Sequence, residues 1–320
     1  MAGERVIGVD LGGTKLLAGV VGRDGRILER DERSTDVSSQ EALLRDLEQL
    51  VADLVRAHDA AAVGVGVPSL IDQRAGRAVS SVNIPLEGVD LRDDLAGRLG
   101  VPVGIDNDAN AATLAEHRFG AGRGTDHMLL LTIGTGVGGG LILDGRIYRG
   151  WSGAGGELGH VTIDENGPPC QGTCPGVGHL EALASGTAVT KRARVVAEER
   201  PDGDLGRLAA ANSEIDGRAI VELAQAGPGD AREVVEEAGR HLGTGIATYV
   251  NVFNPQRIVV GGGFAIGAGE LLLEPARTVV ARRALAPSRD QVTIVAAELG
   301  AEAGLVGAGL VGFEAFAAGS

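Results

Sequence analysis

The sequence predicts an α/β protein made of two blocks built on one plan. Short apolar runs alternate with a leucine-striped helix over the first 120 residues, and a second block in the same style begins near residue 127. The tetrapeptide Asp-Gly-Arg-Ile stands in both blocks, at residues 24–27 and 144–147. In each block it follows an apolar run, a glycine-rich turn and another apolar run. This weak internal repeat predicts a duplicated fold.

The first block predicts strands and helices in alternation. Residues 5–30 predict three strands broken by a Gly-Gly-Thr turn and an Asp-Gly turn. In the helix that follows, Ser38 and Glu41 have the spacing of a capping box. Residues 61–68 and 101–106 predict strands, and residues 107–120 predict a helix that is capped by Asn107 or Asp108 and stopped by Gly120. The leucines of the first helix recur at the helical period, at Leu43, Leu47, Leu50 and Leu54.

The second block predicts a larger domain. Residues 127–150 again predict three strands, and the remaining chain predicts helices at 213–227, 230–255, 269–285 and 301–317 and strands at 257–263 and 291–299. We therefore expect a smaller domain over residues 1–120 and a larger one over 121–320. The last helix, near residues 300–320, is free to pack back on the smaller domain.

Composition excludes several classes of function. The chain has 320 residues, a net charge of −14 and a pI near 4.9. A nucleic-acid partner is not expected, because binding the phosphate backbone needs a basic surface. Asp10 interrupts the apolar stretch at the N-terminus, and the longest uncharged run, residues 128–143, is shorter than the ~18–20 residues that span a bilayer. We expect a cytoplasmic protein without a membrane segment.

A glycine hairpin at residues 134–139 matches the dinucleotide fingerprint G-x-G-x-x-G, with Glu157 near the position of a ribose-binding acid. That fingerprint requires a helix directly after the glycines, whereas this sequence continues as a strand. The dinucleotide interpretation therefore fails. A glycine hairpin still exposes N–H groups that can hold phosphate, and the alternative is a plain tight turn.

Five motifs occur in an order that resembles the ROK family of bacterial sugar kinases and sugar-responsive repressors. They are DLGGTK at 10–15, IDNDANAA at 105–112, IGTGVGGG at 133–140, GAGGELGH at 153–160 and RIVVGGG at 257–263. The resemblance extends from about residue 6 to the C-terminus. It implies a duplicated actin and hexokinase-like fold, related to ribonuclease H, with a cleft between two domains.

The resemblance also implies roles for individual residues. It implies that Asp10 holds Mg²⁺, that Asp108 is the catalytic base, and that Lys15 contacts the nucleotide or forms a structural salt bridge. It implies that the sugar is held by Asn83, Asn107, Asp108, Glu157, His160 and Glu181. For Asn83 the alternative is a turn residue, because an asparagine before Ile-Pro needs no ligand to explain it. It implies that ATP is held by Gly12, Gly13 and Thr14, by Thr135 and Gly136, and by Gly262 and Gly263.

The chemistry of phosphoryl transfer fits a carboxylate at Asp108. A sugar hydroxyl is a weak nucleophile, so a carboxylate must orient it and take its proton. The positive end of a helix favours the ionised form of such a base. The alternative from the residues alone is that Asp108 is only a helix cap.

Both cysteines of the chain lie in one short segment. The resemblance implies a zinc site in which His160 joins three cysteines, but here the second cysteine comes two residues late and His179 replaces the third. His160, Cys170, Cys174 and His179 would form a Cys₂His₂ site suited to tetrahedral Zn²⁺. The alternatives are a Cys170–Cys174 disulfide or a loop without metal. His160 could bind zinc with one ring nitrogen and the sugar with the other, so that zinc would hold the sugar-binding loop in shape.

The resemblance favours a glucokinase that uses ATP to phosphorylate the 6-hydroxyl of glucose and that forms a homodimer or homotetramer. N-acetylmannosamine, N-acetylglucosamine or fructose remain as alternative sugars, and polyphosphate as an alternative donor. A repressor of the same family would carry a helix-turn-helix of ~60 residues before the first phosphate loop. Because this loop begins at Asp10, we do not expect a repressor.

Overall fold

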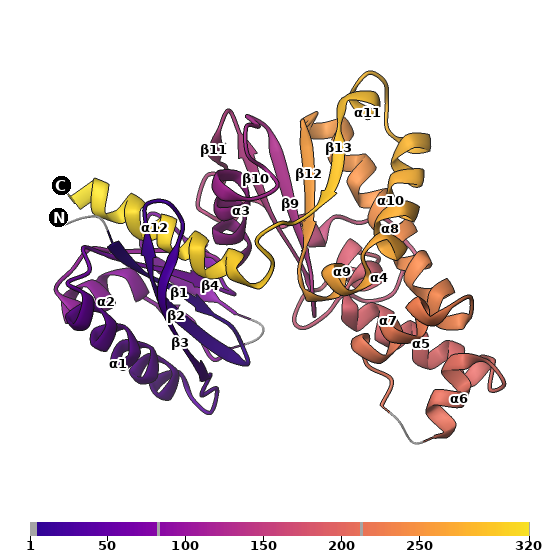
Figure 1. Ribbon diagram of the computed structural model, residues 1–320, viewed down its shortest axis with the longest axis horizontal. Coiled ribbons are helices and arrows are strands. Elements are labelled where there is room, and N and C mark those ends of the chain that lie inside the picture. Colours follow the sequence, from indigo (N-terminus) through magenta and orange to yellow (C-terminus); the bar gives the residue numbers. More distant parts are fainter. Residues whose placement is uncertain (1–4, 82–83, 212–213, 320) are drawn as a thin grey trace. The chain divides into compact units, whose positions relative to one another are not determined.

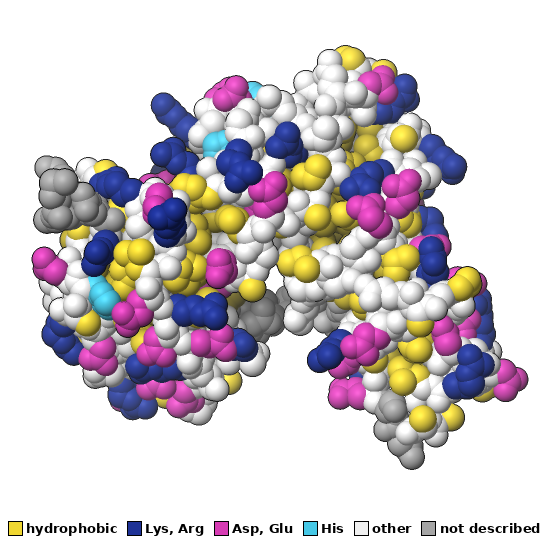
Figure 2. Space-filling view, in the orientation of Figure 1, with side chains coloured by type: hydrophobic (Ala, Val, Ile, Leu, Met, Phe, Trp, Pro, Cys, Tyr) yellow, Lys and Arg dark blue, Asp and Glu magenta, His cyan; other side chains and the backbone are white. Residues whose placement is uncertain are grey.

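The computed structural model describes residues 5–81, 84–211 and 214–319, so Asn83 lies outside the described residues. The chain divides into two compact units. Unit 1 holds Met1–Gly124, Gly140–Gly156 and Ala301–Ser320, and unit 2 holds Thr125–Gly139 and Glu157–Gly300. Figure 2 shows acidic side chains interspersed with basic ones over the visible face.

Unit 1 is built on a mixed five-stranded sheet (Figure 1). β1 (Arg5–Leu11), β2 (Lys15–Gly22) and β3 (Ile27–Ser34) pair antiparallel, while β4 (Val63–Val67) and β8 (Val103–Asn107) continue the sheet parallel to β1. The order is β3-β2-β1-β4-β8. These are the five strands that the sequence predicts for the first block.

The helix α1 (Gln40–His58) buries its leucine stripe as predicted, with none of the four leucines more than 6% exposed. The predicted capping box is wrong by one residue, since the N-cap is Ser39, whose side chain accepts a hydrogen bond from the Ala42 N–H. The Ser38 N–H instead donates to the Asp36 carboxylate at 2.9 Å. This Asx turn delays the start of the helix.

Three short strands and one helix of unit 1 carry no clear sequence signal. β5 (Leu70–Asp72), β6 (Arg77–Ser80) and β7 (Glu87–Val89) form a small antiparallel sheet, followed by α2 (Leu91–Leu99). Strands of three or four residues are too short for alternation to show. α3 (Asp108–Phe119) follows β8 directly and ends before Gly120, as predicted.

The C-terminal helix α12 (Ala303–Gly319) packs on β1, β4, β8 and α3. The contact is close because glycines stand where the backbones meet. A Cβ at Gly64 of β4 would overlap the carbonyl oxygen of Ala308 in α12, and a Cβ at Gly307 of α12 would overlap the carbonyl oxygen of Ala111 in α3. Among the described residues, 300–319 form the one helix long and apolar enough to cross a membrane, but half of that window is buried. Together these contacts indicate a core helix.

The second sheet repeats the plan of the first. Its order is β11-β10-β9-β12-β13, with an antiparallel β10–β11 pair and with β9 and β13 parallel to β12. The boundary between the units falls within β10. The glycine turn leads into a strand, which confirms that the dinucleotide interpretation fails. The strands are β9 (Met128–Ile133), β10 (Val137–Leu143), β11 (Arg146–Ile147), β12 (Arg257–Gly261) and β13 (Thr293–Ala296).

Helices make up most of the rest of unit 2, and α8 packs against α10, α7, α5 and α4. The sequence predicts α7, α8 and α10, but it does not predict α5 or α6. The helices are α4 (Leu180–Ala184), α5 (Gly186–Glu199), α6 (Asp204–Ala210), α7 (Gly217–Ala226), α8 (Asp230–Phe253), α9 (Gly263–Ala268), α10 (Glu270–Arg283) and α11 (Ser288–Gln291).

Candidate functional site

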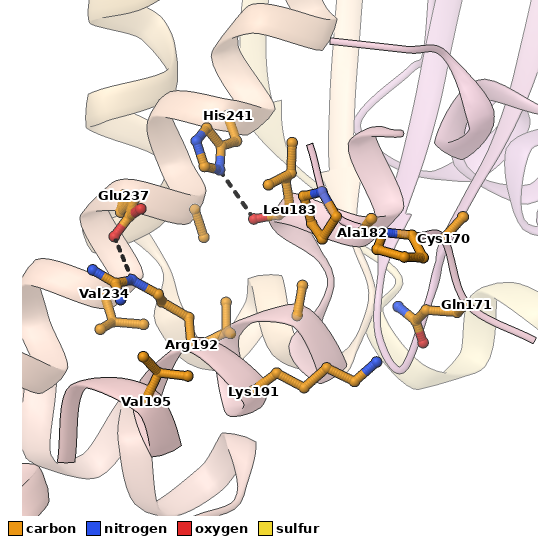
Figure 3. A pocket seen from close by; sticks show the side chains of 15 residues that line it. Cys170, Gln171, Ala182, Leu183, Lys191, Arg192, Val195, Val234, Glu237 and His241 are labelled. Carbon is orange, nitrogen blue, oxygen red and sulfur yellow. Dashed lines mark hydrogen bonds and ion pairs between the residues drawn. The ribbon is translucent and has the colours of Figure 1, made fainter. Parts of the chain in front are cut away.

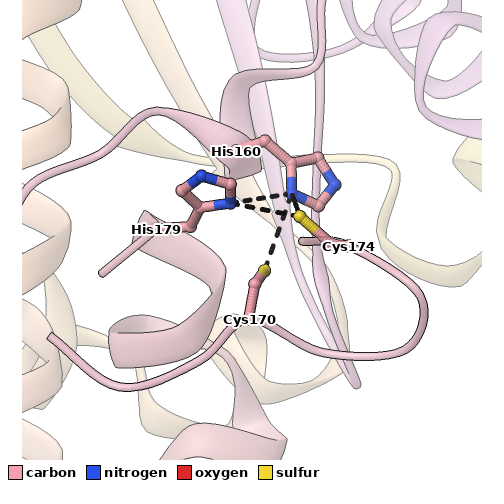
Figure 4. Close-up of side chains that lie close together, drawn as sticks. All are labelled: His160, Cys170, Cys174 and His179. Carbon is pink, nitrogen blue, oxygen red and sulfur yellow. Dashed lines mark hydrogen bonds between the residues drawn. The ribbon is translucent and has the colours of Figure 1, made fainter. Parts of the chain in front are cut away.

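Four side chains of unit 2 converge to form what we call the Cys/His cluster: His160, Cys170, Cys174 and His179 (Figure 4). His160 ends a short 3-10 turn, the cysteines lie on the following loop, and His179 precedes α4. Their potential ligand atoms all lie within 4.8 Å of one another. One 20-residue segment therefore brings four ligand-type side chains to one point.

The distances in the Cys/His cluster fit a tetrahedral metal. The two histidine Nδ1 atoms are 3.3 Å apart, and the nitrogen–sulfur separations are 3.5, 3.6 and 3.7 Å. Tetrahedral zinc, with its usual bond lengths, has edges of ~3.3 Å between nitrogens and ~3.5 Å between nitrogen and sulfur. Both cysteines are free thiols rather than a disulfide. The donor set and its spacing fit Zn²⁺.

The two nitrogens of His160 face different partners. Nδ1 lies in the Cys/His cluster, while Nε2 lies 3.8 Å from Oε2 of Glu157. Burial raises the pKa of Glu157, and the charge of His160 opposes that effect. Gly176 supports the other ring of the cluster, because a Cβ there would overlap His179. The geometry leaves one face of His160 available for a ligand other than the metal.

Glu181 lies between the Cys/His cluster and the glycine hairpin at residues 134–139. Its Oε2 accepts a hydrogen bond from the Val137 N–H at 2.9 Å, and its Oε1 lies 3.7 Å from the Cys170 sulfur. A Cβ at Gly136 would overlap the same carboxylate. Glu181, which the family resemblance predicts to hold the sugar, thus also supports the hairpin.

A cavity of about 860 Å³ opens beside the hairpin within unit 2. Its lining includes Thr135 and Gly263, two of the residues predicted to hold ATP. Gly262 is required by the backbone, since it has φ +88° and its Cβ would lie 2.5 Å from Ile133, whereas Gly263 faces open space. The lining also includes residues that the sequence analysis missed: Thr187, Thr190, Lys191, Arg194, Arg218 and Phe264.

The residues of α5 that line this cavity have a recognisable spacing in the sequence. Thr187, Thr190, Lys191 and Arg194 recur at intervals of three, one and three residues, which places them on one face of a helix. Three cations and one acidic residue, Glu222, line this cavity in a chain of net charge −14. One of the cations, Arg218, is paired with Glu222 at 2.8 Å. The cavity is therefore suited to an anionic ligand.

Residues 10–15, predicted to form the first phosphate loop, make a tight turn between β1 and β2. The Gly12 N–H donates to the Lys15 carbonyl at 2.9 Å, and the Thr35 hydroxyl donates to the Gly12 carbonyl at 2.7 Å. Lys15 forms an exposed ion pair with Glu32 at 2.6 Å. That pair is the structural alternative predicted for Lys15, and it connects the side chains of β2 and β3.

Asp10 lies at the carboxyl end of β1, largely buried, and burial raises its pKa above 3.8. Gly304, in the first turn of α12, lies against it, because a Cβ there would overlap the Asp10 carboxylate. A bulkier residue at position 304 would displace the carboxylate. The first turn of a helix also offers N–H groups and a favourable dipole to an anion.

Asp10→Asn is expected to raise the melting temperature at pH 7 and to raise it less at pH 4. Because burial raises the folded-state pKa of Asp10 above its ordinary value, the folded protein becomes less stable as the pH rises through that raised pKa and the buried carboxyl ionises. Asparagine carries no charge at either pH, so it avoids this cost. Thermal unfolding followed by circular dichroism at both pH values measures this. A variant that is less stable than the wild type at pH 7 would contradict it.

Asp108 is the first residue of α3, and it is not the cap. The N-cap is Asn107, whose Oδ1 accepts hydrogen bonds from the N–H groups of Ala109 at 2.9 Å and Asn110 at 3.3 Å. The Ala109 N–H also donates a hydrogen bond to Oδ1 of Asp108 at 2.8 Å. Of the two capping candidates, Asn107 is confirmed, so capping alone does not explain a carboxylate at Asp108.

A buried ion pair joins Asp106, in the motif at residues 105–112, to Arg149, and the sequence does not predict it. Asp106 is fully buried, and its carboxylate accepts hydrogen bonds from Arg149 at 2.7 Å, from Asn110 at 3.0 Å and from Gln73 at 3.2 Å. Arg149 also pairs with Glu314 of α12. These contacts hold the end of β8, and with it the start of α3, in a fixed position. Asn110 is a neighbour in the chain, whereas Gln73 and Arg149 come from distant parts of it.

The two sheets on one plan define an α/β two-domain protein of the actin and hexokinase-like class. Residues 6–312 match the model of the ROK family, and the chain belongs to that family. It is 37% identical to a glucokinase of Thermotoga maritima, covering 95% of this chain and 96% of that protein, and 34% identical to one of Streptomyces coelicolor, covering 94% and 95%. Its Cys/His cluster is typical of the family's zinc site.

A solved structure agrees closely in fold. The ROK family glucokinase of Streptomyces griseus, in complex with glucose and AMPPNP, is 35% identical with a TM-score of 0.83, covering 97% of this chain and 99% of that chain. The family also includes repressors: a putative xylose repressor of Caldicellulosiruptor is 30% identical over 92% of this chain and 74% of that protein.

Proposed function

We propose that this protein is a glucokinase that transfers the γ-phosphoryl group of ATP to the 6-hydroxyl of glucose. The observation that carries the proposal is the cation-lined cavity beside the second phosphate loop, together with a carboxylate at Asp108 that capping does not require. Its support from relatives is the glucose and AMPPNP bound to the Streptomyces griseus enzyme. The choice of glucose as the sugar rests on these relatives.

In the proposed reaction, Asp108 orients the 6-hydroxyl and accepts its proton as the oxygen attacks the γ-phosphorus, and ADP leaves. Asp10 would hold Mg²⁺, which supplies charge neutralisation on the phosphates when bound. Gly12, Gly13 and Thr14 would face the transferred group. The sugar would be held by Asn83, Asn107, Glu157, His160 and Glu181.

ATP is proposed as the donor because the cavity offers more than cations. Thr135 and Gly136 would hold the phosphate tail, and Gly262 and Gly263 would let the adenosine approach the backbone. Phe264, from the first turn of α9, lines the same cavity and offers an aromatic surface to a base. A polyphosphate chain has no group that would use such a surface.

The Cys/His cluster is proposed to hold one structural Zn²⁺ per chain. His179→Ala removes one of four ligands and is expected to lower the zinc content well below one per chain, because water can fill the open position but cannot tether the chain. Metal analysis of the purified protein by mass spectrometry measures it. His58→Ala, in α1 of the other unit, is the control and should retain its zinc. Wild-type protein without zinc would contradict the assignment.

The experiment that tests the proposed function is a panel of sugars against two donors. Glucose, N-acetylmannosamine, N-acetylglucosamine and fructose are each assayed with ATP and with polyphosphate, and kcat/KM is compared. We expect the highest value for glucose with ATP. A higher value for another sugar would reassign the substrate, and absence of ATP-dependent phosphorylation for every sugar would overturn the proposal.

A further inference from the structure

The residue that follows Cys170 reaches from the Cys/His cluster to the second phosphate loop. The side-chain amide of Gln171 donates a hydrogen bond to the Ser185 hydroxyl at 2.7 Å. The same nitrogen lies 3.5 Å from the carbonyl oxygens of Thr135 and Glu181. Gln171 therefore connects the loop that bears the cysteines to the residues on either side of it.

The carbonyl groups of the phosphate loop are held from the same direction. The Thr187 hydroxyl donates to the Thr135 carbonyl at 2.8 Å, and the Gly186 N–H donates to the Gly134 carbonyl at 2.8 Å. Both donors come from the first turn of α5, which Ser185 caps. Gln171 thus binds both the cap of α5 and the loop that α5 supports, and Gly134 and Thr135 line the proposed nucleotide cavity.

Glu181 makes a second connection in parallel. One carboxylate oxygen accepts from the Val137 N–H and the other lies beside the Cys170 sulfur. Two side chains therefore link the region of Cys170 to residues 134–137. Gln171, its neighbour in the chain, reaches Thr135, and Glu181, beside its sulfur, reaches Val137. Any displacement of Cys170 acts on both.

We propose that Gln171 is a positioning residue through which the Cys/His cluster holds the second phosphate loop, so that zinc occupancy sets the affinity for the phosphate donor. The inference rests on the proposed kinase function. Bonds from zinc to Cys170 would fix the backbone of its neighbour Gln171. The loop would then be ordered before the donor arrives, which lowers the entropic cost of binding.

The surroundings of Gln171 leave room for a substitution of its side chain. A cavity of about 460 Å³ borders it, lined by Cys170, Lys191 and apolar side chains that include Val189 and Val234 (Figure 3). In Figure 3 Lys191 extends toward Gln171. Because open space adjoins the amide, hydrogen bonds rather than tight packing hold it. We therefore expect a leucine of similar size to fit there without disrupting the fold.

Gln171→Leu is expected to keep about one zinc per chain, to leave the glucose affinity unchanged and to weaken AMPPNP binding ~3–10-fold, the scale of one or two lost hydrogen bonds. Calorimetry with AMPPNP and with glucose separately, and metal analysis, measure these. The matched control is Thr173→Val, an exposed isosteric change between the same two cysteines. Steady-state assays should show a raised KM for ATP with a nearly unchanged kcat.

Chelation of zinc supplies the second arm. It should weaken AMPPNP binding to the wild type by a similar factor and to Gln171→Leu by less, since the connection is already cut. Zinc-loaded Gln171→Leu that binds AMPPNP as tightly as the wild type would overturn the inference alone, and so would loss of zinc from this variant. Wild-type protein that does not bind AMPPNP would overturn the proposed function as well.

Discussion

Asp108→Asn is expected to lower kcat by ~10²–10⁴-fold, the contribution typical of a general base. The amide keeps the shape and the hydrogen-bonding reach of the carboxylate, but it cannot accept the proton of the sugar hydroxyl. Because Asn107 caps α3, the substitution should leave the helix intact. The affinities for glucose and AMPPNP should therefore stay close to those of the wild type. Steady-state kinetics and calorimetry measure the two effects separately.

The matched control is Asp94→Asn, which neutralises an exposed acidic residue in the first turn of α2. It changes the charge near a helix N-terminus in the same way, without touching the proposed site, so its kcat should equal that of the wild type. An Asp108→Asn enzyme with near-normal turnover would remove Asp108 from the role of base.

Gly64→Ala is expected to destabilise unit 1 by ~3 kcal/mol or more, at the upper end of what overpacking costs. Its new Cβ would overlap the Ala308 carbonyl oxygen and lie against the Gly312 N–H, both of which are backbone atoms of α12. Neither can rotate away, so the helix must move off the sheet. Urea unfolding monitored by circular dichroism measures the loss.

Gly97→Ala is the control for that experiment. Gly97 lies in α2, and a Cβ there would have no neighbour within 4 Å. Alanine should stabilise this helix by ~0.5–1 kcal/mol through its higher helix propensity. If Gly64→Ala were as stable as the wild type, close packing of α12 on the sheet would not hold.

Periodic patterns predicted the main elements, and local competition shifted their ends. The leucine stripe of α1 and the paired strand blocks follow from apolar periodicity alone. The start of α1 moved by one residue because Asp36 competes for the backbone, a choice that depends on side-chain geometry and not on spacing. Helix α12 was predicted, but its glycines have meaning only against Gly64 and the rest of the sheet, which the sequence does not place beside them.

Part of the candidate site could likewise be predicted from the sequence, and part appears only in the folded chain. The resemblance to the family's zinc motif predicted the Cys₂His₂ set even though the sequence departs from that motif, because four ligand-type side chains still fall within 20 residues of one another. The pair of Asp106 with Arg149 and the reach of Gln171 to Ser185 join segments that only the folded chain brings together. The polar face of α5 has a helical period in the sequence, but its polar residues do not form the apolar stripe from which the other helices are predicted.

The most direct test of the account is to identify the product formed from glucose and ATP with Mg²⁺ by ³¹P NMR. A glucokinase predicts one new phosphate monoester at the 6-position of glucose, in equal amount to the ADP released. No such product should form with the Asp108→Asn variant over the same time. Release of ADP and phosphate without a sugar ester, or an ester at another hydroxyl, would contradict the account.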